Sequence, residues 1–127
     1  MSTRKDRLKK LVQVQEQLKA LHETHRATFL SAAAAAETEA RELVEHFDAT
    51  GSLAGLFPDL YHRRIANAVA RQQASLESAR REAGLIAAAT ARTNMVDRAY
   101  KDVSRRDDRE RSDRDRLDLI AQKRGQE

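Results

Sequence analysis

Histidine is the residue type in this 127-residue chain best suited to bind a metal or move a proton near neutral pH, and it occurs four times. His22 and His25 stand three apart in the segment HETH, a spacing at which two side chains on one helix face can share a metal ion. The zinc-protease pattern differs, because it needs two histidines four apart with a glutamate after the first. No third ligand is evident, so we expect ordinary helix-face or seam histidines. His46 and His62 flank a glycine-rich break, where the turn of the chain alone would bring them near each other.

Other catalytic patterns are missing from the sequence. The chain has no cysteine, which excludes disulfides, thiol catalysis and cysteine-based metal sites. The segment GSLAG at 51–55 lacks the lysine and the flanking strand of a phosphate-binding loop. Two helices alone do not enclose a pocket in which burial could tune an acid or a base. We therefore expect a protein that is not an enzyme and holds no cofactor and no metal.

The composition is typical of long helices. The chain contains 22 alanines, 35% charged residues, 4% aromatic residues, one proline and four glycines. Such a mixture favours a coiled coil over a compact globule. The 40% apolar share would then form a narrow seam between helices.

The net charge of +4 comes from the first ten residues, which hold five cations and one acid. Acids and bases balance in the rest of the chain, so the basic signal is a short cluster and not a basic face. Acids interleaved with the later arginines would repel phosphates, and we therefore do not expect nucleic-acid binding. The apolar run at 29–36 is too short to cross a bilayer.

Helix-breaking residues cluster once, where Gly51, Gly55 and Pro58 lie close together. The sequence therefore predicts an all-α fold in which two long helices form an antiparallel coiled-coil hairpin over residues 1–127. We place the first helix at about 4–48, the loop at about 49–59 and the second helix at about 60–123. Gly51 can adopt the left-handed conformation that ends the first helix, and Asp59 can cap the second. In this hairpin residue i lies opposite roughly residue 108 minus i.

Apolar residues three or four apart predict the seam between the two helices. The predicted seam residues are Leu8, Leu11, Leu18, Leu21, Phe29, Leu43, Phe47, Ile65, Val69, Leu76, Ile86 and Tyr100. Polar residues interrupt the stripes at Gln15, His25, Gln72 and Thr93. We expect a seam of moderate quality, without a strict seven-residue repeat.

The second helix is longer than the first, so its charged end has no partner in the hairpin. This overhang starts at about residue 101 and includes SRRDDRERSDRDR at 104–116, with six arginines and five acids. Seven pairs of opposite charge stand four residues apart between Asp102 and Asp118, but four aspartates and two serines disfavour helix. A marginal, solvated helix is expected. Leu117, Ile120 and Ala121 then restore an apolar stripe, which indicates either a contact with another molecule or a frayed tail in which these residues have no role.

The C-terminal run DRDRLDLIAQKR gives the chain a family resemblance. A helical hairpin of this size that ends in an Arg/Asp-rich run resembles the flagellar FliJ family, and Arg116, Leu117, Asp118 and Ala121 match its terminal pattern. Leu119 stands where an acid is common in the family. The break GSLAGLFPDLYHRRI at 51–65 also resembles the middle region of the family.

The resemblance implies a soluble antiparallel coiled coil similar to the central stalk of rotary ATPases. Such a protein inserts into the ring of the flagellar type III export ATPase, promotes ring assembly, contacts the membrane export gate and handles substrate chaperones. The residues expected to bind the ring are Arg4, Lys5, Arg7, Lys9, Lys10, Arg105, Arg106, Arg109, Leu117 and Ile120. Those expected to face the gate are Phe57, Tyr61 and Arg64. The protein would be a monomer in isolation, cytoplasmic, or peripheral on the inner membrane at the flagellar base.

Two other classes of function stay open at this point. A generic coiled-coil adaptor or scaffold would use the seam for homodimerisation and extend it through LDLIAQKR at 117–124. A nucleic-acid binder would use the basic N-terminal cluster, with a salt dependence set by a few phosphates. Solution mass separates the hairpin monomer from the dimeric adaptor.

Overall fold

The computed structural model describes residues 3–49, 51 and 53–126, and this part of the chain is all-α. Helix α1 spans Arg4–Asp48, the short 3-10 helix η1 spans Leu53–Leu56, and α2 spans Pro58–Gly125. The two long helices pack against each other as a hairpin, and α2 is the longer with 68 residues against 45. The predicted fold class is confirmed.

Local interactions explain where α1 begins and ends. The amide of Thr3 donates to Asp6 Oδ2 at 3.3 Å, and the amide of Asp6 donates to Thr3 Oγ1 at 3.2 Å. This reciprocal cap satisfies two amides at the start of the helix, and the Thr3 amide lowers the pKa of the Asp6 carboxyl below its ordinary value. Helix α1 ends at Asp48, and Gly51, three residues further along the chain, has a φ of 80°, the left-handed conformation predicted for it.

Helix α2 begins earlier than predicted, at Pro58. Proline suits the first helical position because its ring fixes φ and its missing amide is not needed there. The prediction that Asp59 caps this helix is wrong, because Asp59 already lies inside the first turn. Its carboxylate still interacts favourably with the positive end of the helix dipole.

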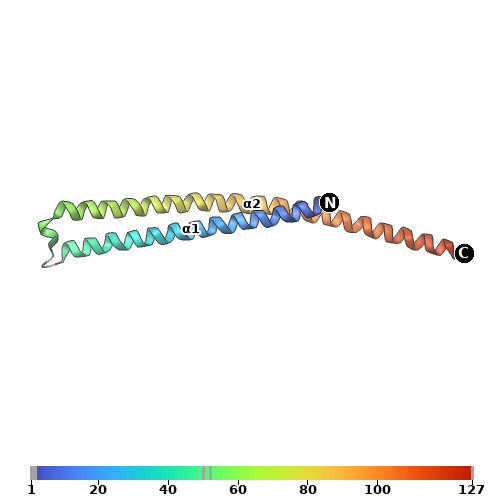
Figure 1. Ribbon diagram of the computed structural model, residues 1–127, viewed down its shortest axis with the longest axis horizontal. Coiled ribbons are helices and arrows are strands. Elements are labelled where there is room, and N and C mark those ends of the chain that lie inside the picture. Colours follow the sequence, from blue (N-terminus) through green and yellow to red (C-terminus); the bar gives the residue numbers. More distant parts are fainter. Residues whose placement is uncertain (1–2, 50, 52, 127) are drawn as a thin grey trace. The chain divides into compact units, whose positions relative to one another are not determined.

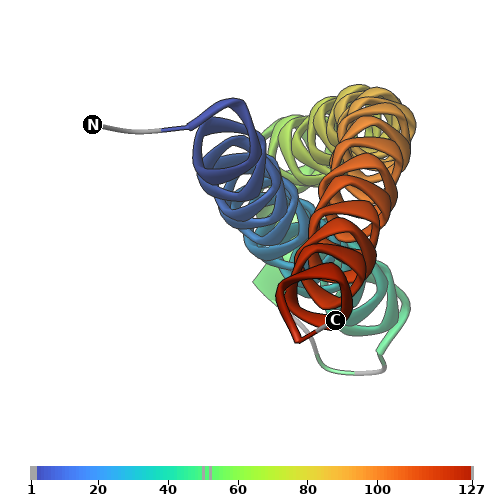
Figure 2. The same ribbon diagram turned by 90° about the vertical axis from the view of Figure 1, so that its right-hand side faces the viewer.

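The chain divides into two compact units. The loop unit comprises residues 19–88, and the terminal unit comprises residues 1–18 with 89–127. Within the loop unit, α1 and α2 run side by side to the turn (Figure 1). Within the terminal unit, the first turns of α1 lie beside the orange part of α2, and the red part of α2 continues without a neighbouring helix (Figures 1 and 2).

Burial follows a seven-residue repeat more regularly than the sequence suggested. Half-buried or buried residues alternate three and four apart from Leu8 to Phe47, with Arg26 as the exposed exception, and from Tyr61 to Asp107. These are the inward positions of a coiled coil. In α1 the repeat passes through polar residues at Gln15 and His22.

The prediction is wrong for four seam residues, which lie beside the inward positions and not on them. Those that prove exposed are Leu11, Leu18, Leu21 and Val69, at 42%, 40%, 48% and 37%. They flank the seam, because the inward positions beside them are held by Val12, Lys19, His22 and Ala68. The other predicted seam residues are half-buried: Leu8, Phe29, Leu43, Phe47, Ile65, Leu76, Ile86 and Tyr100.

Alanine forms the deepest part of the seam. Among the described residues, the buried ones are Ala33, Ala36, Ala68, Ala79 and Ala89, each exposed by 4% or less. Side chains this small let two helix backbones approach closely. The alanine-rich block of the sequence is therefore part of the packing.

The exposed part of α2 starts later than predicted. Val103, Ser104 and Asp107 are half-buried, and uninterrupted exposure runs from residue 108 to the end of α2 at Gly125, which at 1.5 Å per residue is about 27 Å of helix. The overhang predicted from about residue 101 therefore contains half-buried residues as far as Asp107, and its fully exposed part begins at residue 108. In the described part of the chain, neither long helix has an apolar stretch sufficient to cross a bilayer.

Candidate partner-binding surfaces and a histidine–glutamate cluster

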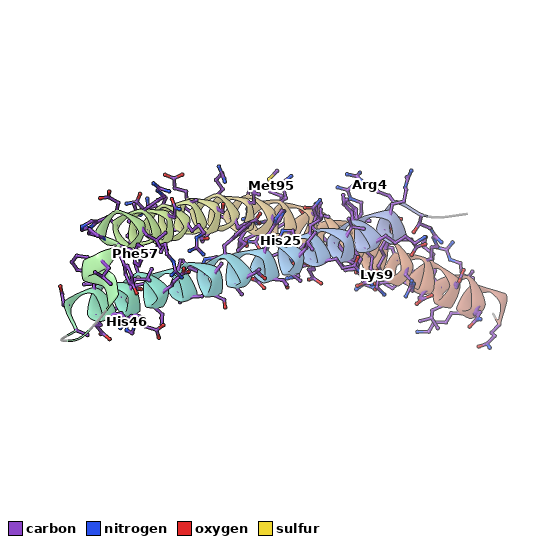
Figure 3. The ribbon with its side chains drawn as sticks, turned by 60° about the vertical axis from the view of Figure 1, so that its left-hand side comes forward. Arg4, Lys9, His25, His46, Phe57 and Met95 are labelled. Carbon is purple, nitrogen blue, oxygen red and sulfur yellow. The ribbon has the colours of Figure 1, made fainter. Side chains whose placement is uncertain are left out.

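The basic cluster at the start of α1 surrounds the helix. Arg4, Arg7, Lys9 and Lys10 are exposed, and Lys5 is half-buried. Figure 3 shows Arg4 and Lys9 pointing away from α1 in different directions.

The overhang carries the remaining residues predicted to bind the ring, and they are also exposed. These are Arg105, Arg106, Arg109, Leu117 and Ile120. Leu117 is 65% exposed and Ile120 is 49% exposed, and Leu119 between them, which the prediction omitted, is 58% exposed. Both the basic cluster and the overhang belong to the terminal unit.

The opposite charges of the overhang are arranged differently from the prediction. Among the described residues 102–118, none of the seven predicted pairs forms an ion pair within 4.0 Å. Just before this stretch, Asp97 forms an ion pair with Lys101 at 3.0 Å. Exposed pairs at this spacing are worth little, so water competes with them successfully. One shallow hollow on the overhang is lined by both signs of charge, from Asp107, Glu110, Arg111 and Arg114.

Near the loop, the three residues predicted to face a gate differ in their exposure to solvent. Phe57 is 58% exposed and Arg64 is exposed, whereas Tyr61 is half-buried. The Tyr61 ring stacks on His46 with centroids 6.4 Å apart, and Phe47 packs on Tyr61 at 6.2 Å. Tyr61 therefore helps to hold α2 against α1.

The two histidines beside the loop each pack on an aromatic ring, His46 on Tyr61 and His62 on Phe47 at 5.1 Å.

Two exposed apolar residues near the loop, Leu56 and Leu60, were not among the predicted binding residues. They are 70% and 48% exposed and stand beside Phe57 in the sequence. We call Leu56, Phe57 and Leu60 the apolar tip.

Two polar links cross between the helices of the loop unit. Arg71 Nη2 donates to Glu39 Oε2 at 2.7 Å, and His22 Nδ1 lies 2.7 Å from Glu82 Oε2. In the predicted hairpin, two residues that lie opposite each other have numbers that add to about 108. The numbers in these two pairs add to 110 and 104. The predicted alignment of the helices is therefore correct in this unit.

The second link extends to a third side chain. His25 Nδ1 lies 3.6 Å from Glu82 Oε1, and the two imidazole centroids are 6.2 Å apart. Side-chain exposure is 23% for His22, 14% for Glu82 and 47% for His25. The sequence shows no third group of this kind beside the two histidines, whereas the structure brings Glu82 to them from the other helix. The signal was present in the alignment, which places His25 opposite residue 83.

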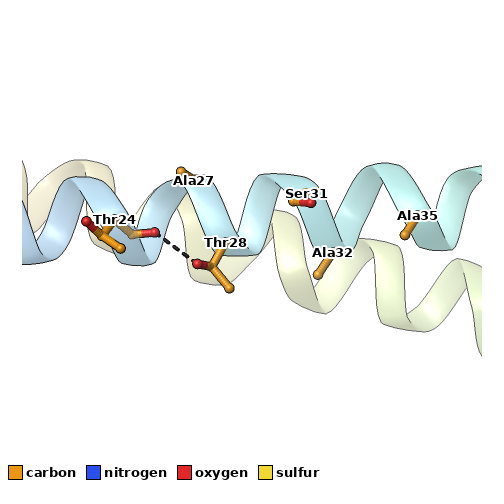
Figure 4. A pocket seen from close by; sticks show the side chains of 6 residues that line it. All are labelled: Thr24, Ala27, Thr28, Ser31, Ala32 and Ala35. Carbon is orange, nitrogen blue, oxygen red and sulfur yellow. Dashed lines mark hydrogen bonds between the residues drawn. The ribbon is translucent and has the colours of Figure 1, made fainter.

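A shallow groove on α1 offers no comparable chemistry. It is lined by Thr24, Ala27, Thr28, Ser31, Ala32 and Ala35 (Figure 4). The Thr28 hydroxyl donates to the carbonyl of Thr24 at 3.1 Å, and the Thr24 hydroxyl donates to the carbonyl of Ala20 at 3.0 Å. Both hydroxyls are thus used within their own helix.

The described surface therefore offers a charged terminal unit, the apolar tip and the His22–His25–Glu82 cluster. Charge and exposed apolar area recognise proteins, and the cluster has the donor atoms of a transition-metal site. Comparison with models of protein families, with curated proteins and with solved structures found no match for this chain.

Proposed function

We propose that this chain is a stalk and escort protein of the flagellar type III export ATPase complex, like the FliJ family that its sequence resembles. In this role it promotes assembly of the ATPase ring and couples the ring to the export gate and to substrate chaperones. The observation that carries the proposal is the exposed, charged end of α2, which belongs to the same compact unit as the basic start of α1.

The charges of the terminal unit fit a protein that sits inside a ring. The arginines of the overhang are exposed, and none of its seven predicted pairs forms in the described residues, so each can meet an acidic loop of the ATPase. Contacts between exposed charges are individually weak and act over about 8–10 Å at physiological salt. A stalk held by many such contacts can detach from one subunit and engage the next.

The apolar tip supports a second contact, with the export gate. Leu56 and Phe57 are 70% and 58% exposed, at the turn between the helices. Adjacent exposed apolar side chains are typical of surfaces that bind another protein. In this proposal they contact the export gate with Arg64, while the protein stays in the cytoplasm or on the inner surface of the membrane.

Charge reversal tests the contact with the ring. The double variant Arg105→Glu/Arg106→Glu is compared with Arg80→Glu/Arg81→Glu, a second exposed Arg-Arg pair that lies in the loop unit. The wild-type chain should bind the export ATPase and stimulate its ATP hydrolysis. The first variant should need at least roughly tenfold more protein for half-maximal stimulation, and the second should behave as wild type. Equal effects of the two variants, or no stimulation by the wild type, would contradict the proposal.

A homodimerising adaptor is the second candidate, and one observation favours it. Leu11, Val14 and Leu18 stand three and four apart in the terminal unit and are 42%, 48% and 40% exposed. Such a stripe could pack against a second copy of the chain. Light scattering over a hundredfold range of concentration separates the candidates. A constant monomer mass supports the stalk, whereas a stable dimer that Leu11→Glu/Leu18→Glu dissociates supports the adaptor.

A further inference from the structure

Three side chains with metal-binding atoms converge on one place between the helices of the loop unit. His22 and His25 come from α1 and Glu82 comes from α2. One ligand atom from each lies within 4.8 Å of the others. The three residues are 60 positions apart in sequence at their widest, so the fold brings them together.

The donor set and its spacing fit Zn²⁺. Two imidazole nitrogens and one carboxylate oxygen are common zinc ligands at about 2.0–2.2 Å, which places neighbouring ligand atoms about 3.4 Å apart in a tetrahedron. His22 Nδ1 lies 2.7 Å from one carboxylate oxygen of Glu82, and His25 Nδ1 lies 3.6 Å from the other. Because 2.7 Å is shorter than the required spacing, His22 Nδ1 and Glu82 Oε2 must move apart by about 0.7 Å to bind one ion.

The position of the cluster in the seam also needs an explanation. His22 and Glu82 occupy inward positions of the seven-residue repeat, where apolar residues are the stable choice. Polar groups at partly buried positions are costly unless they are well partnered. The 3.6 Å separation leaves His25 outside hydrogen-bonding distance of Glu82. An ion between the three groups would partner each of them.

We propose that His22, His25 and Glu82 bind one Zn²⁺ ion that ties α1 to α2, with water in the remaining coordination position. An ion bound to both helices stabilises only the folded hairpin, since the unfolded chain separates its ligands. The proposal does not depend on the role in export, because it concerns metal binding by the isolated chain.

Removing each ligand in turn tests the site in the full-length chain, with ZnCl₂ as the probe in competition with a chromophoric chelator. Wild-type protein should bind one Zn²⁺ per chain. His22→Ala, His25→Ala and Glu82→Gln should each weaken binding by roughly tenfold or more. His46→Ala and His62→Ala remove the two other histidines of the chain and should leave zinc affinity unchanged.

His25→Ala separates a metal site from a structural hydrogen bond. This variant keeps the His22–Glu82 contact and changes a side chain that is 47% exposed, so it should fold and melt like wild type in EDTA. Zinc should raise the melting temperature of the wild type and fail to raise that of the variant. The proposal is overturned if the wild type does not bind zinc, if the ligand variants bind it as tightly as the wild type, or if zinc instead joins two chains into a dimer.

Discussion

Nη2 of Arg71 lies 2.7 Å from Oε2 of Glu39 and joins α2 to α1 across the edge of the seam in the loop unit. The two side chains are 58% and 38% exposed, so water and salt screen their attraction. Together with the contact between His22 and Glu82, this ion pair helps to determine which residues of α1 lie opposite which residues of α2.

A double-mutant cycle on Arg71→Ala and Glu39→Ala should measure a coupling of roughly 0.2–1 kcal/mol at low ionic strength. The coupling should fall towards zero in 1 M NaCl because the pair is exposed. The cycle of Glu39→Ala with Arg41→Ala is the control, since Arg41 donates to Thr38. A coupling for Arg71 that is unchanged by salt would show that the pair acts through packing and not through charge.

Two glycines should respond in opposite directions to the same substitution. Gly84 lies within α2, and a Cβ added there meets nothing within 4 Å, so Gly84→Ala should raise the free energy of unfolding by about 1 kcal/mol. Gly51 has a φ of 80°, where a Cβ is strained, and Gly51→Ala should lower it by about 1–2 kcal/mol. Urea denaturation of both variants measures the difference. If both substitutions changed the free energy of unfolding in the same direction, the strain expected from a side chain at Gly51 would be contradicted.

Gln15 carries a polar atom that the seam does not satisfy. Among the described residues, its Oε1 is buried without a hydrogen-bond partner. Gln15→Leu removes this atom and adds apolar volume at an inward position, and it should raise the free energy of unfolding by about 1 kcal/mol. Gln17→Leu changes an exposed residue of α1 and should shift stability by less than about 0.5 kcal/mol. Chemical denaturation compares the two variants. An equal gain in stability for both would mean that the added apolar side chain, and not the removal of the buried Gln15 oxygen, causes the effect.

The first turn of α1 should lose protection in acid. The Thr3 amide holds the pKa of Asp6 below its ordinary value, because it donates to the carboxylate form. A depressed pKa in the folded state means that the stabilisation is complete above the ordinary aspartate pKa and disappears as pH falls through the lowered value. Amide exchange of Arg7, whose amide bonds the Thr3 carbonyl, reports on this turn. In Asp6→Asn the acid-dependent loss should vanish, and an unchanged loss would assign it to another group.

The helices and the loop follow from local signals, which is why they could be predicted closely. Gly51 adopts the positive φ of the turn that follows the first helix, and Pro58 begins the second helix through its fixed φ. The seam was harder to predict because Leu11, Leu18 and Leu21 also recur at helical spacing. The choice between two overlapping stripes depends on what the other helix presents, and extending the repeat back from Phe29 by seven residues would have placed His22 inward.

The candidate metal site was hidden for a related reason. His22 and His25 are visible as a pair in the sequence, but Glu82 joins them only through the alignment of two helices. The charged overhang shows the opposite case. Its helix was predicted from the spacing of opposite charges, and the structure has the helix without the ion pairs that this spacing predicted. Continuity with the packed part of α2 is sufficient to explain that helix.

The alanine seam has a consequence for how this protein responds to temperature. Because its buried side chains are alanines in the described residues, unfolding exposes little additional apolar surface for each residue that becomes disordered. The heat capacity change of unfolding scales with that apolar surface, and so does the dependence on denaturant. The hairpin should therefore have a shallow stability curve, with a free energy of unfolding that changes slowly between a cold and a warm environment.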